Sequence, residues 1–296
     1  MAWLATEAPP GRRGEMIGTA MGAAVGGALL GPVVGGVADA VGTGPAFASA
    51  AVAAGVLMAV ALALPAPHGA IPQGVREAFT AMGDRRLSLG LWLTTLAGLG
   101  FGVLDVLAPL RMASLGVTAL IIAGTFLAAA GVEAALSPVA GRAADRRGPI
   151  VPITCSLVGA VAISLLAPTL ASAWALVPVL IVGMPFFGTL FTPGMTLVSE
   201  AAQHQRLDQG LAFGLVNLAW AVGQAIAASG SGALAQITSD LVPYSLLAVA
   251  CAATLALVRI KRVLSPGDRP ACPGIHRVRR VPGPAARRPW RGTADR

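Results

Sequence analysis

The sequence predicts an all-α membrane protein with eight transmembrane helices. Hydrophobic residues make up 55% of the 296 residues and charged residues only 11%, whereas soluble domains average about 45–50% and 25%. The apolar residues also gather into long runs, and a helix needs about 20 of them to cross the hydrocarbon core of a bilayer. Composition and run length together therefore predict a bundle of membrane-spanning helices.

Eight apolar runs follow one another, separated by short polar loops. The many glycines and prolines fit such a bundle, because neighbouring helices satisfy the backbone groups that proline leaves open. The runs cover residues 15–38, 45–64, 87–112, 117–139, 150–170, 173–198, 210–236 and 240–260.

Basic residues mark alternate loops. The loops after the first, third, fifth and seventh runs contain no Lys or Arg. Cytoplasmic loops carry the excess of basic residues, so we expect a plasma-membrane protein with both termini in the cytoplasm. The basic residues outside the tail that support this orientation are Arg12, Arg13, Arg76, Arg85, Arg86, Arg142, Arg146, Arg147 and Arg206.

The first run carries a stripe of glycines. Gly27, Gly31 and Gly35 recur every fourth residue, so one helix face has no side chains and a neighbouring helix can approach closely. Pro32 removes one backbone hydrogen bond and predicts a kink. Helix dimerisation or core packing explains this stripe as well as a functional motif does.

The stripe is also part of a longer pattern, formed by Gly27, Gly31, Pro32, Gly35 and Gly36. It resembles the antiporter motif in the fifth helix of the major facilitator superfamily, in its drug/proton antiporter branch. The resemblance implies proton-coupled efflux of small organic molecules by alternating access, without enzymatic activity or a cofactor.

A second motif lies between the fourth and fifth runs. Gly141, Asp145, Arg146 and Gly148 resemble the cytoplasmic loop motif of the same superfamily. We expect the two glycines to permit tight turns at helix ends, and Asp145 to cap a following helix or to pair with an arginine. The resemblance implies a latch between conformations; a charged loop that only anchors topology is the alternative.

An internal repeat links the first and seventh runs. Two six-helix repeats, the first lacking four helices, would explain it, so the chain would hold family helices 5–12. We interpret residues 1–64 as an incomplete N-terminal half, 65–86 as a central cytoplasmic loop, 87–262 as a complete C-terminal half and 263–296 as a disordered basic tail. At an offset of 196 residues the repeat aligns Gly14 with Gly210, Gly18 with Gly214, Ala23 with Ala219, Gly27 with Gly223 and Gly36 with Gly232.

Two carboxylates lie well inside predicted spans. A charge near the bilayer centre costs about 3 kcal/mol, so it normally faces a cavity or a partner. Asp105 and Glu133 are therefore candidates for binding the coupled proton. A structural pairing with a buried donor is the alternative for both, as is an interfacial position near Arg111 for Asp105.

One face of the seventh run is amphipathic. Phe213, Asn217, Trp220 and Gln224 are spaced by four, three and four residues, which places them on one side of a helix. They can line a cavity for an organic substrate. Hydrogen bonding between helices, combined with core packing, is the alternative.

Other classes of function find little support. The three histidines, His68, His204 and His276, have no metal-ligand spacing, and eleven of the 21 basic residues lie in the tail from Arg259 onward. We therefore expect no metal site and no nucleic-acid partner, but a lipid bilayer, protons and a small organic substrate. The competing hypothesis is a truncated, non-transporting membrane remnant or an assembly partner for another chain.

Overall fold

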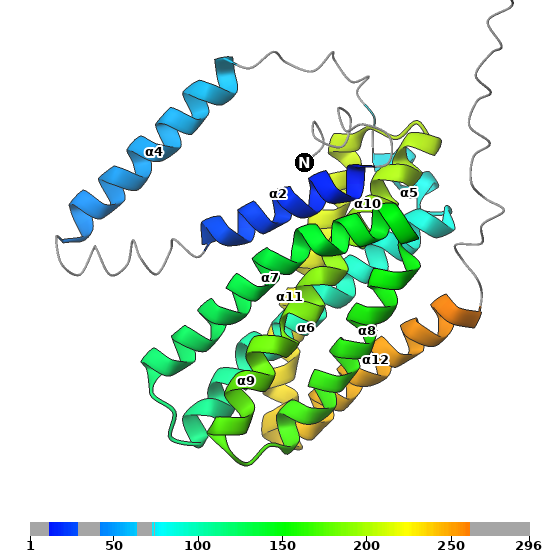
Figure 1. The fold of residues 1–296 in the computed structure, drawn as a ribbon. Coiled ribbons are helices and arrows are strands. Elements are labelled where there is room, and N and C mark those ends of the chain that lie inside the picture. The colour runs from blue at the N-terminus through cyan, green and yellow to red at the C-terminus, as the bar shows by residue number, and fades with distance from the viewer. Residues whose placement is uncertain (1–11, 29–41, 64–72, 74, 261–296) are drawn as a thin grey trace, which may run out of the picture. The chain divides into compact units, whose positions relative to one another are not determined.

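The computed structural model describes residues 12–28, 42–63, 73 and 75–260. These residues form helices and no strand, which confirms the all-α fold (Figure 1). The elements are α2 (Arg13–Ala28), α4 (Thr43–Ala63), α5 (Val75–Ala81), α6 (Arg85–Ser114), α7 (Ala119–Arg147), α8 (Ile150–Leu166), the 3₁₀ turn η1 (Ala167–Thr169), α9 (Ala173–Gly183), α10 (Pro185–His204), α11 (Gln209–Ile237) and α12 (Leu241–Ile260).

Six helical segments in the described part of the chain are long and apolar enough to cross a membrane. They correspond to the last six predicted runs. The second run corresponds to α4, which contains a shorter apolar stretch, Ala48–Val60. The first run begins as α2, and its remaining residues, 29–38, lie outside the described residues.

The sixth run is divided into two helices. α9 ends at Gly183 and α10 begins at Pro185, with Met184 between them. Proline is well suited to the first turn of a helix, because the N–H that it lacks would have no partner there. Met184 still donates its N–H to Leu180 O, at 3.0 Å, so helical hydrogen bonding continues up to the break.

Small residues bring α6 and α11 into backbone contact. A Cβ at Gly102 would lie 2.6 Å from Gln224 O, and one at Gly98 would overlap the carbonyl oxygen of Trp220. Neither position can therefore carry a side chain without separating the two helices. This is the close approach that packing in lipid favours, where dispersion takes over from the hydrophobic effect.

α2 packs against α7 in the same way (Figure 1). A Cβ at Gly22 would lie 2.6 Å from Ala134 O, and one at Gly18 would overlap the carbonyl oxygen of Ser137. A Cβ at Gly27 would have no atom of the described residues within 4 Å, so none of the described helices makes the close approach expected there. The stripe that makes contact is Gly14, Gly18 and Gly22; Gly31, Pro32, Gly35 and Gly36 lie outside the described residues.

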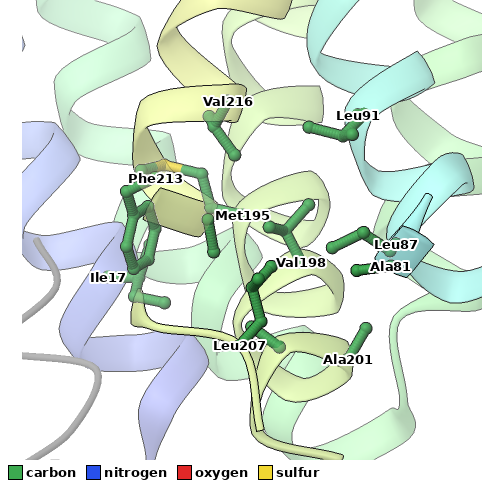
Figure 2. Packing of buried hydrophobic residues seen from close by; sticks show 12 residues of the cluster. Ile17, Ala81, Leu87, Leu91, Met195, Val198, Ala201, Leu207, Phe213 and Val216 are labelled. Carbon is green, nitrogen blue, oxygen red and sulfur yellow. The ribbon is translucent and has the colours of Figure 1, made fainter. Parts of the chain in front are cut away.

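A cluster of buried apolar side chains joins α2, α5, α6, α10 and α11 (Figure 2). Ile17 comes from α2 and is fully buried, so the helix that contacts α7 also contributes to this cluster. The cluster consists of Ile17, Ala81, Leu87, Leu91, Met195, Val198, Ala201, Ala202, Leu207, Ala212, Phe213 and Val216.

Part of the predicted loop 65–86 is helical, because α5 occupies Val75–Ala81. Gln73 anchors this region to the α10–α11 turn: its Nε2 donates to Arg206 O at 2.8 Å, and its Oε1 accepts from Asp208 N at 2.7 Å. The connecting segment thus contains a short helix and is tied to the α10–α11 turn by side-chain hydrogen bonds that local sequence does not reveal.

Asp84 starts α6. Its Oδ1 accepts hydrogen bonds from Arg86 N at 2.8 Å and Leu87 N at 3.0 Å, and Gln205 donates to Oδ2 at 3.3 Å. Partial burial acts to raise the pKa of this carboxyl, but the hydrogen bonds and the charge of Arg86 outweigh it, so the pKa lies below its ordinary value. The ionised carboxylate is therefore the form that caps the helix.

Candidate functional site

A cavity of about 590 Å³ lies among α2, α6, α7, α10 and α11. Its size is within the range of about 300–1,000 Å³ that is typical of small-molecule sites. Its lining is mostly aromatic and aliphatic, with four polar side chains that can orient a ligand. It is formed by Met21, Val25, Phe101, Asp105, Phe126, Ala129, Ala130, Glu133, Met184, Gly188, Phe191, Met195, Phe213, Asn217, Trp220 and Gln224.

The structure places the predicted face of α11 along this cavity. Phe213, Asn217, Trp220 and Gln224 all contribute to the lining. Phe213 is otherwise buried, whereas Asn217 is open to the cavity. The helical spacing that put the four side chains on one face therefore also directs them to one space.

Asp105 enters the cavity from α6. Gln224 Nε2 lies 3.4 Å from Asp105 Oδ2, a long hydrogen bond between α11 and α6. Arg111, the cation expected near Asp105, donates instead to Leu170 O at 3.1 Å, and no ion pair joins it to Asp105 among the described residues. The carboxylate of Asp105 is thus held by an amide and remains open to the cavity.

Glu133 reaches the cavity from α7 and is only 9% exposed. Its carboxylate lies against Gly188 of α10, where a Cβ would overlap the carboxyl group. In the part of the chain that the structure describes, no side chain or amide donates a hydrogen bond to that carboxylate. Gly188 therefore provides the space that the Glu133 carboxylate occupies.

Several lining residues escaped the sequence analysis, although helical spacing could have found two of them. Phe101 precedes Asp105 by four residues and Phe126 precedes Glu133 by seven, so each shares a helix face with a carboxylate. Phe191 and Gly188 carried no such signal, because the charged and amide residues of α10 lie in its last turns, at least nine residues further along the helix.

Asp145 joins α7 to the beginning of α2. Its two carboxylate oxygens accept hydrogen bonds from Gly14 N at 2.9 Å and Glu15 N at 2.7 Å. The helix that it caps thus precedes it by about 130 residues, so the expectation of a following helix is wrong. A carboxylate is well placed there, because a helix N-terminus has free N–H groups and a positive dipole end.

The other three members of the loop motif lie at the end of α7, inside α7 and on the surface. Gly148 ends α7 with a φ of +81°, as expected for a glycine at a helix end. Gly141 is not at a helix end: it lies buried inside α7, where a Cβ would overlap the carbonyl oxygen of Gly14. Arg146 is exposed, and Arg142 forms a long exposed contact of 3.9 Å with Glu15.

A bundle of long apolar helices around a cavity that holds two carboxylates defines a multi-pass membrane protein with an internal cavity. The family model of the Major Facilitator Superfamily matches residues 1–209, which is most of the chain. The chain therefore belongs to the Major Facilitator Superfamily, a family of membrane transporters and not of enzymes. Comparison with curated proteins gives no significant match.

Proposed function

We propose that this transporter is a proton-coupled antiporter of the drug/proton type, which exports small organic molecules across the cell membrane by alternating access. The observation that carries the proposal is the presence of Asp105 and Glu133 in one cavity lined by aromatic side chains. Both termini lie in the cytoplasm, as the distribution of basic residues indicates.

The physical reason concerns the cost of charge in the membrane. A carboxylate without a counter-charge is expensive there, so a bound proton or a bound cation lowers the free energy of the site. Glu133 has no hydrogen-bond donor among the described residues, and Asp105 has only a long contact to Gln224. Exchange between a proton and a substrate at these groups would couple the two fluxes.

The α2–α7 junction supports alternating access. If α2 and α7 are family helices 5 and 8, they belong to opposite halves of the transporter. Asp145 then ties the two halves together at the cytoplasmic end through hydrogen bonds to α2, while the glycine contacts let the helices meet closely. Breaking this junction would be part of opening towards the cytoplasm.

The test uses the full chain reconstituted in proteoliposomes, with a fluorescent organic substrate and an imposed pH gradient. We expect gradient-driven flux in the wild type and a loss of it in Asp105→Asn and Glu133→Gln. Glu77→Gln, on the exposed surface of α5, is the control and should leave the flux unchanged. Equal flux in all three variants would refute the assignment of these carboxylates; a wild type without flux would favour the assembly-partner hypothesis.

A further inference from the structure

We propose that this protein binds a membrane phospholipid at a peripheral site, with the phosphate group between Arg76 and Arg206 and an acyl chain in the groove between α6 and α11. The site is separate from the central cavity, because the two sets of lining residues share no member. The inference therefore goes beyond the proposed transport and does not depend on it.

A polar pocket of about 320 Å³ supplies the place for the phosphate. It lies between α5 and the turn that joins α10 to α11, and it is lined by Arg76 from α5 and Arg206 from the turn. Glu77 is the one acidic residue among its described lining residues, so positive charge is in excess. Such an excess favours an anionic group, and a guanidinium matches the geometry of a phosphate with two parallel N–H donors.

The neutral polar side chains of this pocket already have partners. Gln73 bonds to the backbone of the α10–α11 turn through both ends of its amide, at 2.8 and 2.7 Å. Gln205 donates to Asp84 at 3.3 Å, and Thr80 donates to the backbone of α5 at 2.9 Å. Among the described residues, by contrast, no hydrogen bond or ion pair engages the guanidinium group of either arginine. The two arginines are therefore the groups that remain available to a ligand.

The backbone conformation of Arg206 indicates that its side chain has a use. Its φ of +54° lies in the left-handed region, just after the last turn of α10. Its N–H donates to Gln203 O at 3.2 Å, and the next N–H in the chain, of Leu207, donates to Ala202 O at 2.8 Å. These two bonds form the Schellman motif, in which glycine is the usual residue at the left-handed position because it has no Cβ. Arginine is strained there, and strain of this kind is typical of functional positions.

An adjoining groove of about 270 Å³ supplies the place for an acyl chain. Ala81 lines the polar pocket and Met82, its neighbour in the chain, lines the groove, which continues between α6 and α11. Trp92 and Leu218 also line the groove and are 41% and 60% exposed. Both belong to helices that are long and apolar enough to cross a membrane, so this exposed surface faces lipid.

The groove is suited to a chain and not to a polar ligand. Its two hydroxyl side chains, Ser88 and Thr95, donate to backbone carbonyl oxygens nearby. The indole N–H of Trp92 donates to Thr254 of α12 at 2.8 Å. These donors are therefore all engaged, whereas a chain gains dispersion contacts with the apolar side chains. A basic pocket beside an apolar groove matches an amphiphile, and basic pockets of this kind between membrane helices hold lipid head groups.

The experiment measures binding of phosphatidylglycerol with brominated acyl chains to the purified full chain in detergent. Bromine quenches tryptophan fluorescence at short range, and Trp92 lies in the groove. We expect saturable quenching that is lost in Trp92→Phe, although the chain has five tryptophans in all. Quenching that does not saturate, or that persists unchanged in Trp92→Phe, would overturn the proposal.

Competitors separate the two parts of the ligand and its sources. Unbrominated phosphatidylglycerol should restore the fluorescence. Inorganic phosphate and glycerophosphoglycerol, which lack chains, and dioleoylglycerol, which lacks the phosphate, should each compete more weakly by about tenfold or more, because each fills only one of the two spaces. Competition by inorganic phosphate as strong as that of the lipid would show a free-anion site, and equal competition by dioleoylglycerol would show an unselective apolar groove. Either result would overturn the phospholipid assignment.

Substitutions then test the two arginines. Arg76→Gln and Arg206→Gln should each weaken lipid binding by about fivefold, which corresponds to one basic residue acting near a membrane surface. Arg147→Gln is the matched control, because Arg147 is an exposed arginine in the last turn of α7 and does not line the pocket. Wild-type affinity in either pocket variant, or an equal loss in the control, would overturn the proposal.

Arg206→Gly separates lipid binding from stability. Glycine relieves the strain at a φ of +54°, so we expect a higher midpoint of unfolding in SDS together with lipid binding that is weaker by about fivefold. A side chain that serves only the fold would give the opposite pair of results, a lower midpoint and unchanged lipid binding, and would overturn the role of Arg206. The expected gain in stability also removes misfolding as the cause of weaker binding.

Discussion

Gly22→Ala tests whether backbone contact holds α2 against α7. The added Cβ would lie 2.6 Å from Ala134 O, and ordinary contact begins at 3.4 Å, so the helices must separate by about 0.8 Å or the backbone must distort. Overpacking of this kind costs about 1–3 kcal/mol. Alanine also favours the helical state over glycine by about 1 kcal/mol, so the substitution alone does not isolate the packing cost.

Gly26→Ala removes that ambiguity. Gly26 lies one turn further along α2, and a Cβ there would have no atom of the described residues within 4 Å, so this variant shows the gain in helix propensity without the clash. We expect Gly22→Ala to have a free energy of unfolding about 1–3 kcal/mol below that of Gly26→Ala. Reversible unfolding in mixed SDS and non-ionic micelles would measure the difference. Two variants that agree within about 0.5 kcal/mol would refute the packing argument.

Three further predictions concern the polar contacts at the helix ends. Asp145→Asn should lower the free energy of unfolding by about 1–3 kcal/mol, because the backbone amides of Gly14 and Glu15 lose the charge and one of the two acceptor oxygens. Faster hydrogen exchange of these two amides would support the prediction, and unchanged exchange would contradict it. The pKa of the Asp84 carboxyl is lowered from 3.8, so the ionised carboxylate stabilises the fold above pH 3.8, and this contribution is lost as the pH falls through the lower pKa of the folded state. Asp84→Asn should abolish this part of the pH dependence of the free energy of unfolding, as measured in unfolding titrations. A pH dependence like that of the wild type would disprove the prediction. Gln73→Ala should speed hydrogen exchange of the Asp208 backbone amide, which loses its acceptor at 2.7 Å. Exchange at the wild-type rate would show that the Gln73 hydrogen bond does not protect this amide.

The sequence by itself determined the fold class and most of the helices. Apolar run length is a direct consequence of bilayer thickness, so the bounds of the last six runs could be predicted to within about two residues, except that α7 and α10 extend eight and six residues beyond the predicted ends. The spacing along α11 also grouped Phe213, Asn217, Trp220 and Gln224 on one face, because the period of a helix is a local property. Both results depend only on residues that are near one another in the chain.

Only the tertiary structure decided which faces meet. Two glycine stripes in and beside the first run are equivalent by local rules, yet Gly14, Gly18 and Gly22 contact α7, whereas a Cβ at Gly27 would meet no atom of the described residues within 4 Å. Lipid is as apolar as the side chains, so hydrophobicity cannot rank the faces of a membrane helix, and close packing with a particular neighbour makes the choice.

The carboxylates depend on long-range contacts in the same way. Asp145 caps a helix about 130 residues earlier in the chain, and Glu133 fits because α10 has a glycine opposite it. A helix period shows which side chains share a face, but not which donor or which vacant volume another helix brings to that face. The candidate site is therefore a product of helix packing, built from residues whose types alone could only mark them as costly to bury.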